Sequence, residues 1–489
     1  MLCTLVRWGR QHEKRAIMIP LLASFFLTVG AAVDVDAPRV WVEIAVSDVD
    51  FVRSELEAEG FDVAGVDRAR NRVGIIVAQG EVGALEARGF DVEIRERSRP
   101  FRSIEAERRG TGLAPDAGYR DVEEIEADLL TLADTYPNLA VRVDLNAAYG
   151  TPLTEEGRRI YGLKLSDNPT LDEDEPAIAF IGLHHARELN SIEASFDTAE
   201  QLLLSYDSDP QVQAWLKHFE IWIIPSVNPD GLAYVWDVDA FWRKNRRDNG
   251  GGAFGVDLNR NYPFQWGECG NVSSSPFSEV YRGAAPLSEP EAQTMAAFVD
   301  SENVFAMLTY HSYGQDLLYP YTCATLAESG KIYAGRDRYG SVAGYGSRLA
   351  SATGEDFEHF YNSHNTVAYL IEMGTSFQPP IEETYTEIES HIRDGWRFFL
   401  GAIIGAPVLA GHVIDAVTLA PLVADVSVSE LNFQEGERIH SESVFGRYHV
   451  ILPPGTYTVT WSVEGYAPVT RSIDVFKGWQ LEDVALSPL

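Results

Sequence analysis

The spacing of apolar residues divides the chain into three regions. In the central region, residues 119–406, short apolar runs alternate with segments of helical periodicity such as residues 121–136. Four runs have the length and composition of buried strands. They span residues 177–183, 219–225, 304–310 and 367–371. This alternation predicts an α/β domain with a mixed, mostly parallel central sheet flanked by helices.

A different pattern precedes the central region. Residues 38–95 follow the order strand, helix, strand, strand, helix, strand, and both helical segments end at a Gly-Phe pair. This order predicts a small ferredoxin-like α+β domain. Residues 96–118 are basic, contain proline and glycine and lack an apolar period. We therefore expect an exposed linker there, either open to trypsin-like proteases or serving only as a tether.

Short alternating runs separated by turn residues fill the end of the chain, residues 407–489. They predict a small β-sandwich of about seven strands. Neither this region nor residues 38–95 contains a cluster of reactive side chains. Any chemistry is therefore expected in the central domain.

The first residues have the pattern of an export signal. Basic residues from Arg7 to Arg15 precede an apolar run at residues 16–32, which ends in small residues suited to cleavage. We expect a signal peptide at residues 1–32 and a secreted or periplasmic protein. An uncleaved membrane anchor is the alternative, because the run is only slightly shorter than a spanning helix. In an oxidising destination Cys269 and Cys323 would form a disulfide, with two free thiols as the alternative.

Length and charge narrow the choice of function. The 489 residues are enough for several domains and a large core. The net charge of -34 argues against nucleic acid as a partner, because nucleic-acid binders need basic patches to neutralise phosphates. We expect membrane contact only through an uncleaved signal, if at all.

Polar side chains follow each of the four apolar runs. His185 and Glu188 follow the first run, Asn228-Pro-Asp230 the second, His311 the third and Glu372 the fourth. Ligand sites in open α/β sheets lie outside the carboxyl ends of the strands. We therefore expect these residues to share one site.

Two imidazoles and a carboxylate in this set suggest a metal centre. A catalytic zinc ion takes three protein ligands of this kind and keeps a fourth position open for water. His185, Glu188 and His311 are the predicted ligands of one zinc ion. His184 competes with His185, but adjacent side chains of an extended segment point in opposite directions, so we expect a structural role for it.

An acid and two arginine-bearing loops complete the candidate chemistry. Glu372 follows five apolar residues, and burial raises the pKa of such a carboxyl unless it is paired. That suits a general base, with a paired structural carboxylate as the alternative. Residues 242–246 and 257–261 supply guanidinium groups, which stabilise an oxyanion or grip a carboxylate through two parallel hydrogen bonds.

The ordered motifs HHARE, NPDG, WRKNR, VDLNRN, HSY…YPY and IE resemble the zinc metallocarboxypeptidases, the carboxypeptidase A-like family. The similarity covers residues 119–406, and the segment EMGTSFQPP resembles secreted bacterial members. The N-terminal unit resembles the pro-segments of the family, which cover the cleft until the linker is cut. The C-terminal sandwich resembles the transthyretin-like domain of the regulatory branch. The resemblance implies a zymogen of a secreted exopeptidase that acts on the C-termini of peptides and proteins.

The resemblance also implies a role for each matching residue. His185, Glu188 and His311 would bind zinc, Glu372 would act as general base and acid, and Arg246 would stabilise the oxyanion. The implied substrate contacts are Asn259 and Arg260 for the terminal carboxylate, and Arg187 and Tyr313 for the next subsite inward.

Two departures from the family pattern leave questions open. A mobile tyrosine usually precedes the glutamate, but Ala350 stands at the expected position, and Tyr345 would serve only if the loop is shifted. The positions expected to line the side-chain pocket, Thr322 and Phe357, favour apolar terminal residues. The acids at residues 355–358 would admit basic ones.

Two other functions are weighed against this one. A peptidoglycan or γ-glutamyl peptidase of the same fold would differ in the loop that grips the carboxylate, and Asn259-Arg260 argues against it. A catalytically inactive peptide-binding protein would lack a zinc ligand or the general base. The chain keeps all four of these residues.

Overall fold

The computed structural model of the protein describes residues 39–67, 70–110, 118–323, 338–431, 433 and 435–489. All of them belong to one compact unit, Val35–Leu489. The expected signal peptide, residues 1–32, lies outside the described residues. In the part of the chain that is described, no helix has the length and apolarity needed to cross a membrane.

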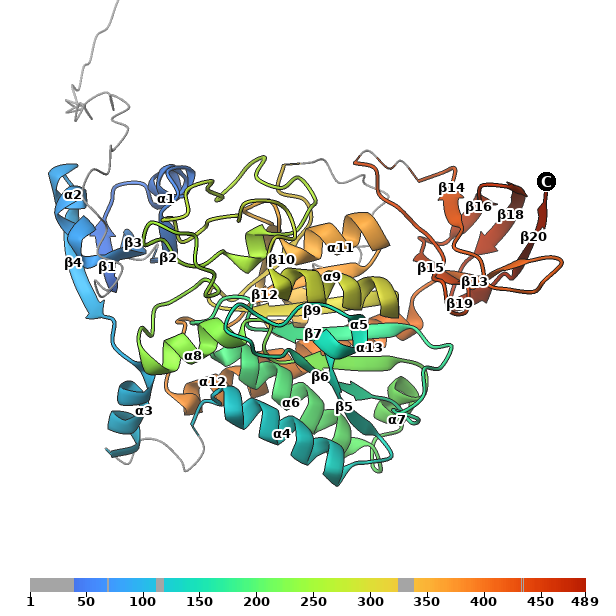
Figure 1. The fold of residues 1–489 in the computed structure, drawn as a ribbon, viewed down its shortest axis with the longest axis horizontal. Coiled ribbons are helices and arrows are strands. Elements are labelled where there is room, and N and C mark those ends of the chain that lie inside the picture. Colours follow the sequence, from blue (N-terminus) through green and yellow to red (C-terminus); the bar gives the residue numbers. More distant parts are fainter. Residues whose placement is uncertain (1–38, 68–69, 111–117, 324–337, 432, 434) are drawn as a thin grey trace, which may run out of the picture. The chain divides into compact units, whose positions relative to one another are not determined.

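A mixed eight-stranded sheet forms the centre of the fold (Figure 1), with the order β11-β10-β12-β9-β7-β8-β6-β5. The strands are β5 (Ala140–Asp144), β6 (Tyr161–Leu165), β7 (Ala177–Gly182), β8 (Glu220–Ile224), β9 (Val304–His311), β10 (Asp316–Tyr319), β11 (Gly346–Leu349) and β12 (Val367–Glu372). The four strands predicted from the apolar runs, β12, β9, β7 and β8, are adjacent and parallel at its centre. β10 and β6 run antiparallel beside them. The predicted sheet is confirmed.

Alternate residues of β7 enter two separate cores, one on each face of the sheet. Ile178 and Phe180 belong to the first core, and Ala179 and Ile181 belong to the second, as the two-residue period of a strand requires. Helices whose residues contribute to the first core include α3 (Phe101–Gly110), α4 (Val122–Thr135), α6 (Asn190–Ser205), α7 (Pro210–Leu216), α8 (Pro229–Asp237), α12 (Ile381–Glu387) and α13 (Arg393–Gly405). The second core takes residues from α5 (Leu145–Tyr149), α9 (Pro290–Glu302) and α11 (Asp356–His364). Burial on both faces explains why the central strands are continuously apolar.

The N-terminal domain has the element order expected from the sequence. Its elements are β1 (Arg39–Ala45), α1 (Val49–Ala58), β2 (Asp62–Asp67), β3 (Arg72–Ala78), α2 (Val82–Ala87) and β4 (Asp91–Arg97). The strands form an antiparallel sheet in the order β2-β3-β1-β4. Alternate residues of β1, Val40, Val42 and Ile44, are fully buried in the small core of the domain.

The expected exposed linker, residues 96–118, is corrected by the structure. A helix, α3 (Phe101–Gly110), occupies much of it, and Phe101 and Ile104 are buried. The ring of Phe101 packs edge-on against Tyr119 and Trp236, at 5.7 and 5.1 Å between centroids. Two apolar residues three positions apart make a short stripe, which the surrounding basic residues obscured in the sequence. Residues 111–117 lie outside the described part of the chain.

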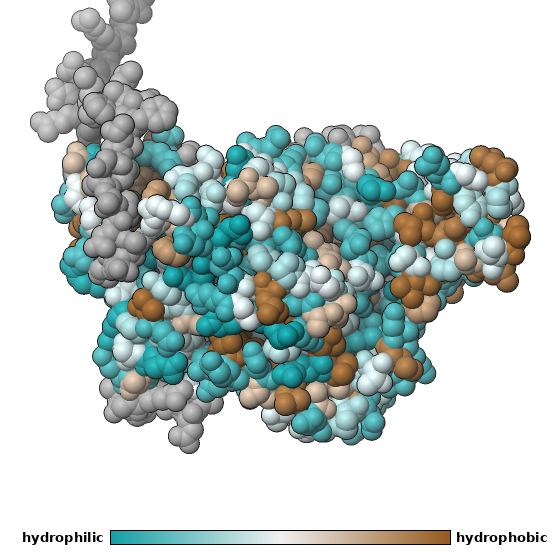
Figure 2. Space-filling model, viewed as in Figure 1, coloured by the Kyte–Doolittle hydropathy of each residue, from teal (hydrophilic) through white to brown (hydrophobic). Residues whose placement is uncertain are grey.

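The C-terminal domain is built of two small sheets around one core. Its strands are β13 (Val408–Asp415), β14 (Asp425–Val428), β15 (Arg447–Ile451), β16 (Gly455–Ser462), β17 (Tyr466–Ala467), β18 (Val469–Val475), β19 (Trp479–Leu481) and β20 (Val484–Pro488). Figure 2 shows hydrophilic residues over most of the visible face, with hydrophobic residues gathered over this domain. The predicted β-rich C-terminal region is confirmed.

Candidate active site

Two imidazoles and a carboxylate converge where β7 and β9 end. His185 and Glu188 lie in the turn between β7 and α6, and His311 is the last residue of β9. His185 Nδ1 is 2.8 Å from Glu188 Oε1, and His311 Nδ1 is 3.0 Å from Glu188 Oε2 and 3.1 Å from His185 Nδ1. The three side chains are buried, and their ligand atoms all lie within 4.8 Å of one another.

The donor chemistry of this cluster fits a zinc ion. Burial lowers the pKa of His311 to about 4, although Glu188 opposes the shift, so the ring is neutral and offers a lone pair at neutral pH. Burial would raise the pKa of Glu188, but its contacts with His185 and His311 outweigh burial and hold that pKa well below its usual value. Two imidazoles with one carboxylate are a ligand set of catalytic zinc.

Sheet register explains why residues so distant in sequence meet here. β7, β9 and β12 are parallel, with Gly182 opposite Tyr310 and His311 opposite Glu372. The carboxyl ends of the three strands therefore open at one edge of the sheet. The turn after β7 is held in place by Asn228, whose Nδ2 donates to the backbone oxygen of His184 at 3.1 Å.

Asp257 fixes the orientation of His185. Its Oδ1 is 3.1 Å from His185 Nε2, which leaves Nδ1 facing the cluster. Arg243 donates to the other oxygen of Asp257 from Nε and Nη2, at 3.0 and 2.9 Å. Although burial opposes it, Arg243 and Arg260 hold the pKa of Asp257 well below its usual value. Such carboxylate–histidine pairs set the tautomer of metal-binding histidines, and the sequence reasoning did not single out Asp257 for this role.

His184 is not part of the cluster, as expected. Its Nε2 lies 3.1 Å from the hydroxyl of Tyr262 and 3.5 Å from Asp356 Oδ2. Burial lowers the pKa of His184 to about 3. The ring is neutral and packs nearly parallel to His311, with 5.4 Å between centroids.

Glu372 ends β12 beside His311. Its side chain is half-buried, and within the described residues its carboxylate has no hydrogen-bond partner. Burial, followed by the charge of Glu188, raises the pKa of Glu372 to about 8. The half-buried position expected for this carboxyl is observed, and its role as general base stays a prediction.

The placement expected for Arg246 is corrected. Its guanidinium stacks on the rings of Tyr234 and Trp242, at 3.7 and 4.5 Å from their centroids, and Nε is 3.6 Å from Glu156. The guanidinium beside the metal ligands belongs to Arg243, whose Nη1 is 3.8 Å from Glu188 Oε1. Asp257 draws the buried Arg243 toward the cluster, whereas aromatic rings hold Arg246 at the other end of the same segment.

Asn259 and Arg260 adjoin the cluster through Asp257, two and three residues earlier. Arg260 Nη1 donates to the backbone oxygen of Asn259 at 2.7 Å and to Glu355 Oε1 at 3.1 Å, and its Nε lies 4.0 Å from Asp257 Oδ2. Asn259 Oδ1 accepts from the backbone N–H of Asp356 at 2.9 Å. Asn259 Nδ2 is buried without a partner in the described part of the structure.

The N-terminal domain covers Arg187 and Tyr313. Arg187 donates to Asp62 of β2 through both terminal nitrogens, with 2.7 Å between Nη2 and Oδ1. At Gly65 of the same strand a Cβ would lie 2.7 Å from Cζ of Tyr313, so only glycine fits there. Ala64 and Ile76 pack nearby against Phe241 of the central domain.

The structure also shows where Tyr345 lies and where the two residues expected to line the side-chain pocket, Thr322 and Phe357, lie. Tyr345 is buried, its hydroxyl donates to Glu387, and its ring stacks on His391. It is therefore a structural residue in this arrangement. Phe357 is fully buried in the second core, and the Thr322 hydroxyl donates to the backbone oxygen of Ala352 at 2.8 Å. Neither provides a free apolar surface for a substrate side chain.

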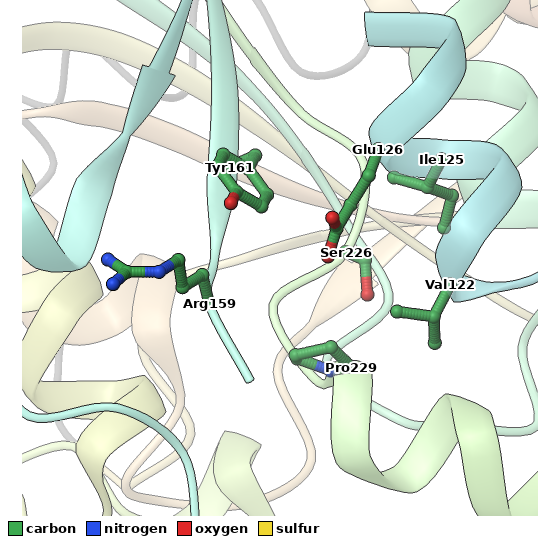
Figure 3. A pocket seen from close by; sticks show the side chains of 7 residues that line it. All are labelled: Val122, Ile125, Glu126, Arg159, Tyr161, Ser226 and Pro229. Carbon is green, nitrogen blue, oxygen red and sulfur yellow. The ribbon is translucent and has the colours of Figure 1, made fainter. Parts of the chain in front are cut away.

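Two further features complete the surroundings of the site. Cys269 and Cys323 form a disulfide, which decides between the two alternatives left by the sequence. A separate small pocket lies among residues of α4, β6 and the turn after β8 (Figure 3). Its lining residues are Val122, Ile125, Glu126, Arg159, Tyr161, Ser226 and Pro229. None of the predicted metal ligands lines it.

Comparison with known proteins gives a consistent result. A family profile described as zinc carboxypeptidase matches residues 125–397. Carboxypeptidase A1 of Sus scrofa is 34% identical over 273 residues, which cover 55% of this chain and 60% of that protein. Zinc carboxypeptidase A 1 of Anopheles gambiae is 31% identical over 274 residues, which cover 52% of this chain and 60% of that protein. The chain therefore spans 60% of the length of these two relatives.

A solved structure shares the fold. Carboxypeptidase A from Helicoverpa armigera aligns with a TM-score of 0.61 and 21% sequence identity. The alignment covers 76% of this chain and 99% of that one. At this level of identity the comparison shows the fold alone.

Proposed function

Because the chain belongs to the zinc carboxypeptidase family, we propose that it is a secreted, zinc-dependent exopeptidase. It would hydrolyse the C-terminal peptide bond of peptides and proteins. The observation that carries this proposal is the convergence of His185, Glu188 and His311 beside Glu372, an acid with a raised pKa. Secretion rests on the export signal predicted for residues 1–32.

The residues around the cluster supply the steps of a hydrolysis. A zinc ion bound there would polarise the scissile carbonyl and lower the pKa of a water molecule. Glu372 takes a proton from the attacking water and returns it to the leaving amine. Arg243 places positive charge near the oxygen that becomes negative as the carbonyl carbon turns tetrahedral. Asp257 holds both Arg243 and the ring of His185 in position.

Substrate binding is assigned to residues on either side of these groups. Asn259 and Arg260 both present N–H donors, and paired donors suit a terminal carboxylate. Arg187 and Tyr313 would line the next subsite inward. Binding of a free terminal carboxylate by these donors distinguishes the proposed exopeptidase from a peptidoglycan or γ-glutamyl peptidase of the same fold.

We further propose that the N-terminal domain keeps the enzyme latent. Asp62 occupies both terminal nitrogens of Arg187, and Gly65 lies against Tyr313. A substrate that uses these two side chains cannot bind while β2 is docked. Although α3 is packed, Arg99 and Arg102 have exposed side chains, so trypsin is expected to cut between Arg95 and Arg109 and to raise activity.

The metal mechanism is tested by chelation together with Glu372→Gln. Trypsin-treated protein should lose release of C-terminal residues on chelation and regain it with zinc. Glu372→Gln should keep bound zinc, measured by elemental analysis, while kcat falls roughly 10²-fold or more, because the amide cannot accept the proton. The matched control is Glu383→Gln, at an exposed position of α12. Activity that persists after complete metal removal would refute the mechanism.

A further inference from the structure

Glu372, the proposed general base, is held by its backbone and not by its side chain. Its carboxylate makes no hydrogen bond with any other residue that the structure describes. In the sheet, Glu372 lies opposite His311 of β9 and Asp316 of β10. The next backbone N–H, that of Met373, donates to the backbone oxygen of His311 at 2.8 Å. The direction of the Glu372 carboxylate therefore depends on how the segments that flank these pairs are fixed.

The side chain of Glu387, at the end of α12, contacts these flanking segments. Its Oε1 accepts from the backbone N–H of Gly374, two residues after Glu372, at 3.2 Å. Nε2 of Gln315, the residue before β10, lies 3.2 Å from each oxygen of Glu387. The hydroxyl of Tyr345, just before β11, also donates to Oε1. Glu387 thus joins the chain that follows the general base to the loops that precede β10 and β11.

Two of these contacts lie where the backbone turns sharply. Gly374 has a φ of 69° and Gln315 has a φ of 55°. This left-handed conformation is open to glycine but is unfavourable for a residue with a side chain such as glutamine. The backbone N–H of Gly314 donates to the backbone oxygen of Gly374 at 3.1 Å, so the two turns are also joined directly. A strained residue persists only where its surroundings hold it, and the side-chain amide of Gln315 is held by the carboxylate of Glu387.

A carboxylate is the group that satisfies all three donors. The side chain of Glu387 is 14% exposed, so water competes little for its oxygens. An ionised carboxylate offers about four acceptor positions, and hydrogen bonds to a charged acceptor are stronger than bonds to a neutral one. A backbone N–H, an amide and a hydroxyl converge on it. Glutamine at this position would offer one acceptor oxygen and two donors of its own, so it could not satisfy them all.

We propose that Glu387 is a positioning residue for the general base. By holding Gly374 and Gln315 together, it fixes the direction in which Glu372 presents its carboxylate. The proposal rests on the exopeptidase function proposed above. Without Glu387 the turn after β12 relaxes and the carboxylate of Glu372 shifts. The predicted metal ligands come from β9 and from the turn after β7, so they keep their places. The loss therefore falls on kcat and not on substrate or metal binding.

The first test uses the full-length protein, treated with trypsin that is then inhibited, with hippuryl-phenylalanine and hippuryl-arginine as substrates. Glu387→Ala should lower kcat roughly 10- to 100-fold, the size expected when a catalytic group is misplaced, and change KM less than about twofold. Bound zinc, measured by elemental analysis, should be unchanged. Glu383→Ala, at an exposed position of the same helix, is the matched control and should keep full kcat.

An exchange of two side chains separates positioning from general damage. Glu387→Gln alone leaves three donors with one acceptor oxygen, and Gln315→Glu alone sets two carboxylates against each other. Each change should lower kcat. When the two are combined, the amide introduced at position 387 donates to the carboxylate introduced at position 315, and its oxygen still accepts from Gly374. The combined variant should regain kcat to within about threefold of the unmodified protein, because the two sites are coupled.

The outcomes separate this inference from the proposed function. Equal kcat in Glu387→Ala, Glu383→Ala and the unmodified protein would overturn the inference, as would a loss that the combined exchange does not recover. Loss of bound zinc in Glu387→Ala would place the effect at the metal ligands and also overturn it. If Glu387→Ala does not fold, the two single exchanges and their combination decide. No zinc-dependent hydrolysis of either dipeptide by the unmodified protein would overturn the exopeptidase function itself, and this inference with it.

Discussion

At the scale of single residues, two arginines of one segment have different surroundings. Arg243 is buried between Asp257 and Glu188, whereas Arg246 stacks on Tyr234 and Trp242. Both are arginines of the segment 242–246, so the sequence alone does not show which of them faces the metal cluster. The difference arises from Asp257, which is brought to Arg243 only by the folded chain.

Arg243→Ala is therefore expected to lower kcat, and Arg246→Ala is its matched control. Removing a group that stabilises a developing oxyanion costs roughly 10²- to 10³-fold in kcat. Arg246→Ala removes a guanidinium of the same segment that does not face the metal ligands, so kcat should change little. Steady-state kinetics with trypsin-treated protein measures both. An equal loss of kcat in the two variants would contradict the assignment.

The cluster of His185, Glu188 and His311 was predictable from the sequence because these residues follow apolar runs. A strand that ends in His311 or Glu372 places that residue at the sheet edge, and parallel strands bring such residues together. Asp257 was missed because its role depends on its contact with Nε2 of His185. No motif spacing in the sequence indicates that contact.

At the scale of elements, strand β2 holds the N-terminal domain on the central domain. Gly65 has a φ of 146°, a conformation that side chains rarely adopt, and a Cβ there would overlap Tyr313. The overlap acts against the docked arrangement, whereas the φ penalty acts on strand β2 whether or not the domain is docked. The contact pairs residues far apart in sequence, so no local pattern predicted it.

Gly65→Ala should therefore make the uncut full-length protein active. The expected result is hydrolysis without trypsin at a rate close to that of the trypsin-treated protein, because Tyr313 and Arg187 become accessible. Gly89→Ala is the matched control, since Gly89 also has a positive φ, of 90°, in the same domain but no atom within 4 Å of its would-be Cβ. Hydrolysis is measured before and after trypsin. A latent Gly65→Ala protein, or an uncut natural chain that is already fully active, would argue against this account.

The long apolar strands were predictable, and a short helix was not. β7, β8, β9 and β12 are apolar over most of their length, which is typical of strands buried on both faces. Helix α3 buries Phe101 and Ile104 within a basic, proline-containing stretch, so its apolar stripe is too short to stand out. Tertiary contacts with Tyr119 and Trp236 decide its position.

At the scale of the whole molecule, the C-terminal sandwich shares a core with the central domain. Val408 and Ala410 of β13 belong to the first core of the sheet. Trp479 of β19 packs edge-on against Phe305 of β9, with 5.3 Å between ring centroids. β9 carries His311 at its end, so the sandwich supports the strand that delivers a predicted metal ligand.

Trp479→Ala should destabilise the protein more than Phe476→Ala does. Trp479 is half-buried against Phe305, so its removal is expected to lower the free energy of unfolding by about 2 kcal/mol, less than for a fully buried aromatic residue. Phe476 of the same domain is 60% exposed, and its removal should have little effect. Denaturant unfolding of the two variants measures the difference. Equal stability would indicate that the sandwich is an independent appendage.

The docking of Asp62 on Arg187 also bears on how the proposed latency would end. A domain joined to the body of the protein meets its binding surface at an effective concentration on the order of millimolar, whatever the protein concentration in solution. One cut in the chain turns that encounter into a bimolecular one. Dilution then favours dissociation, although every atom of the contact is unchanged. Release of the N-terminal domain would thus depend on whether the chain is intact. Cut molecules would stay inactive for longer in a concentrated solution than in a dilute one.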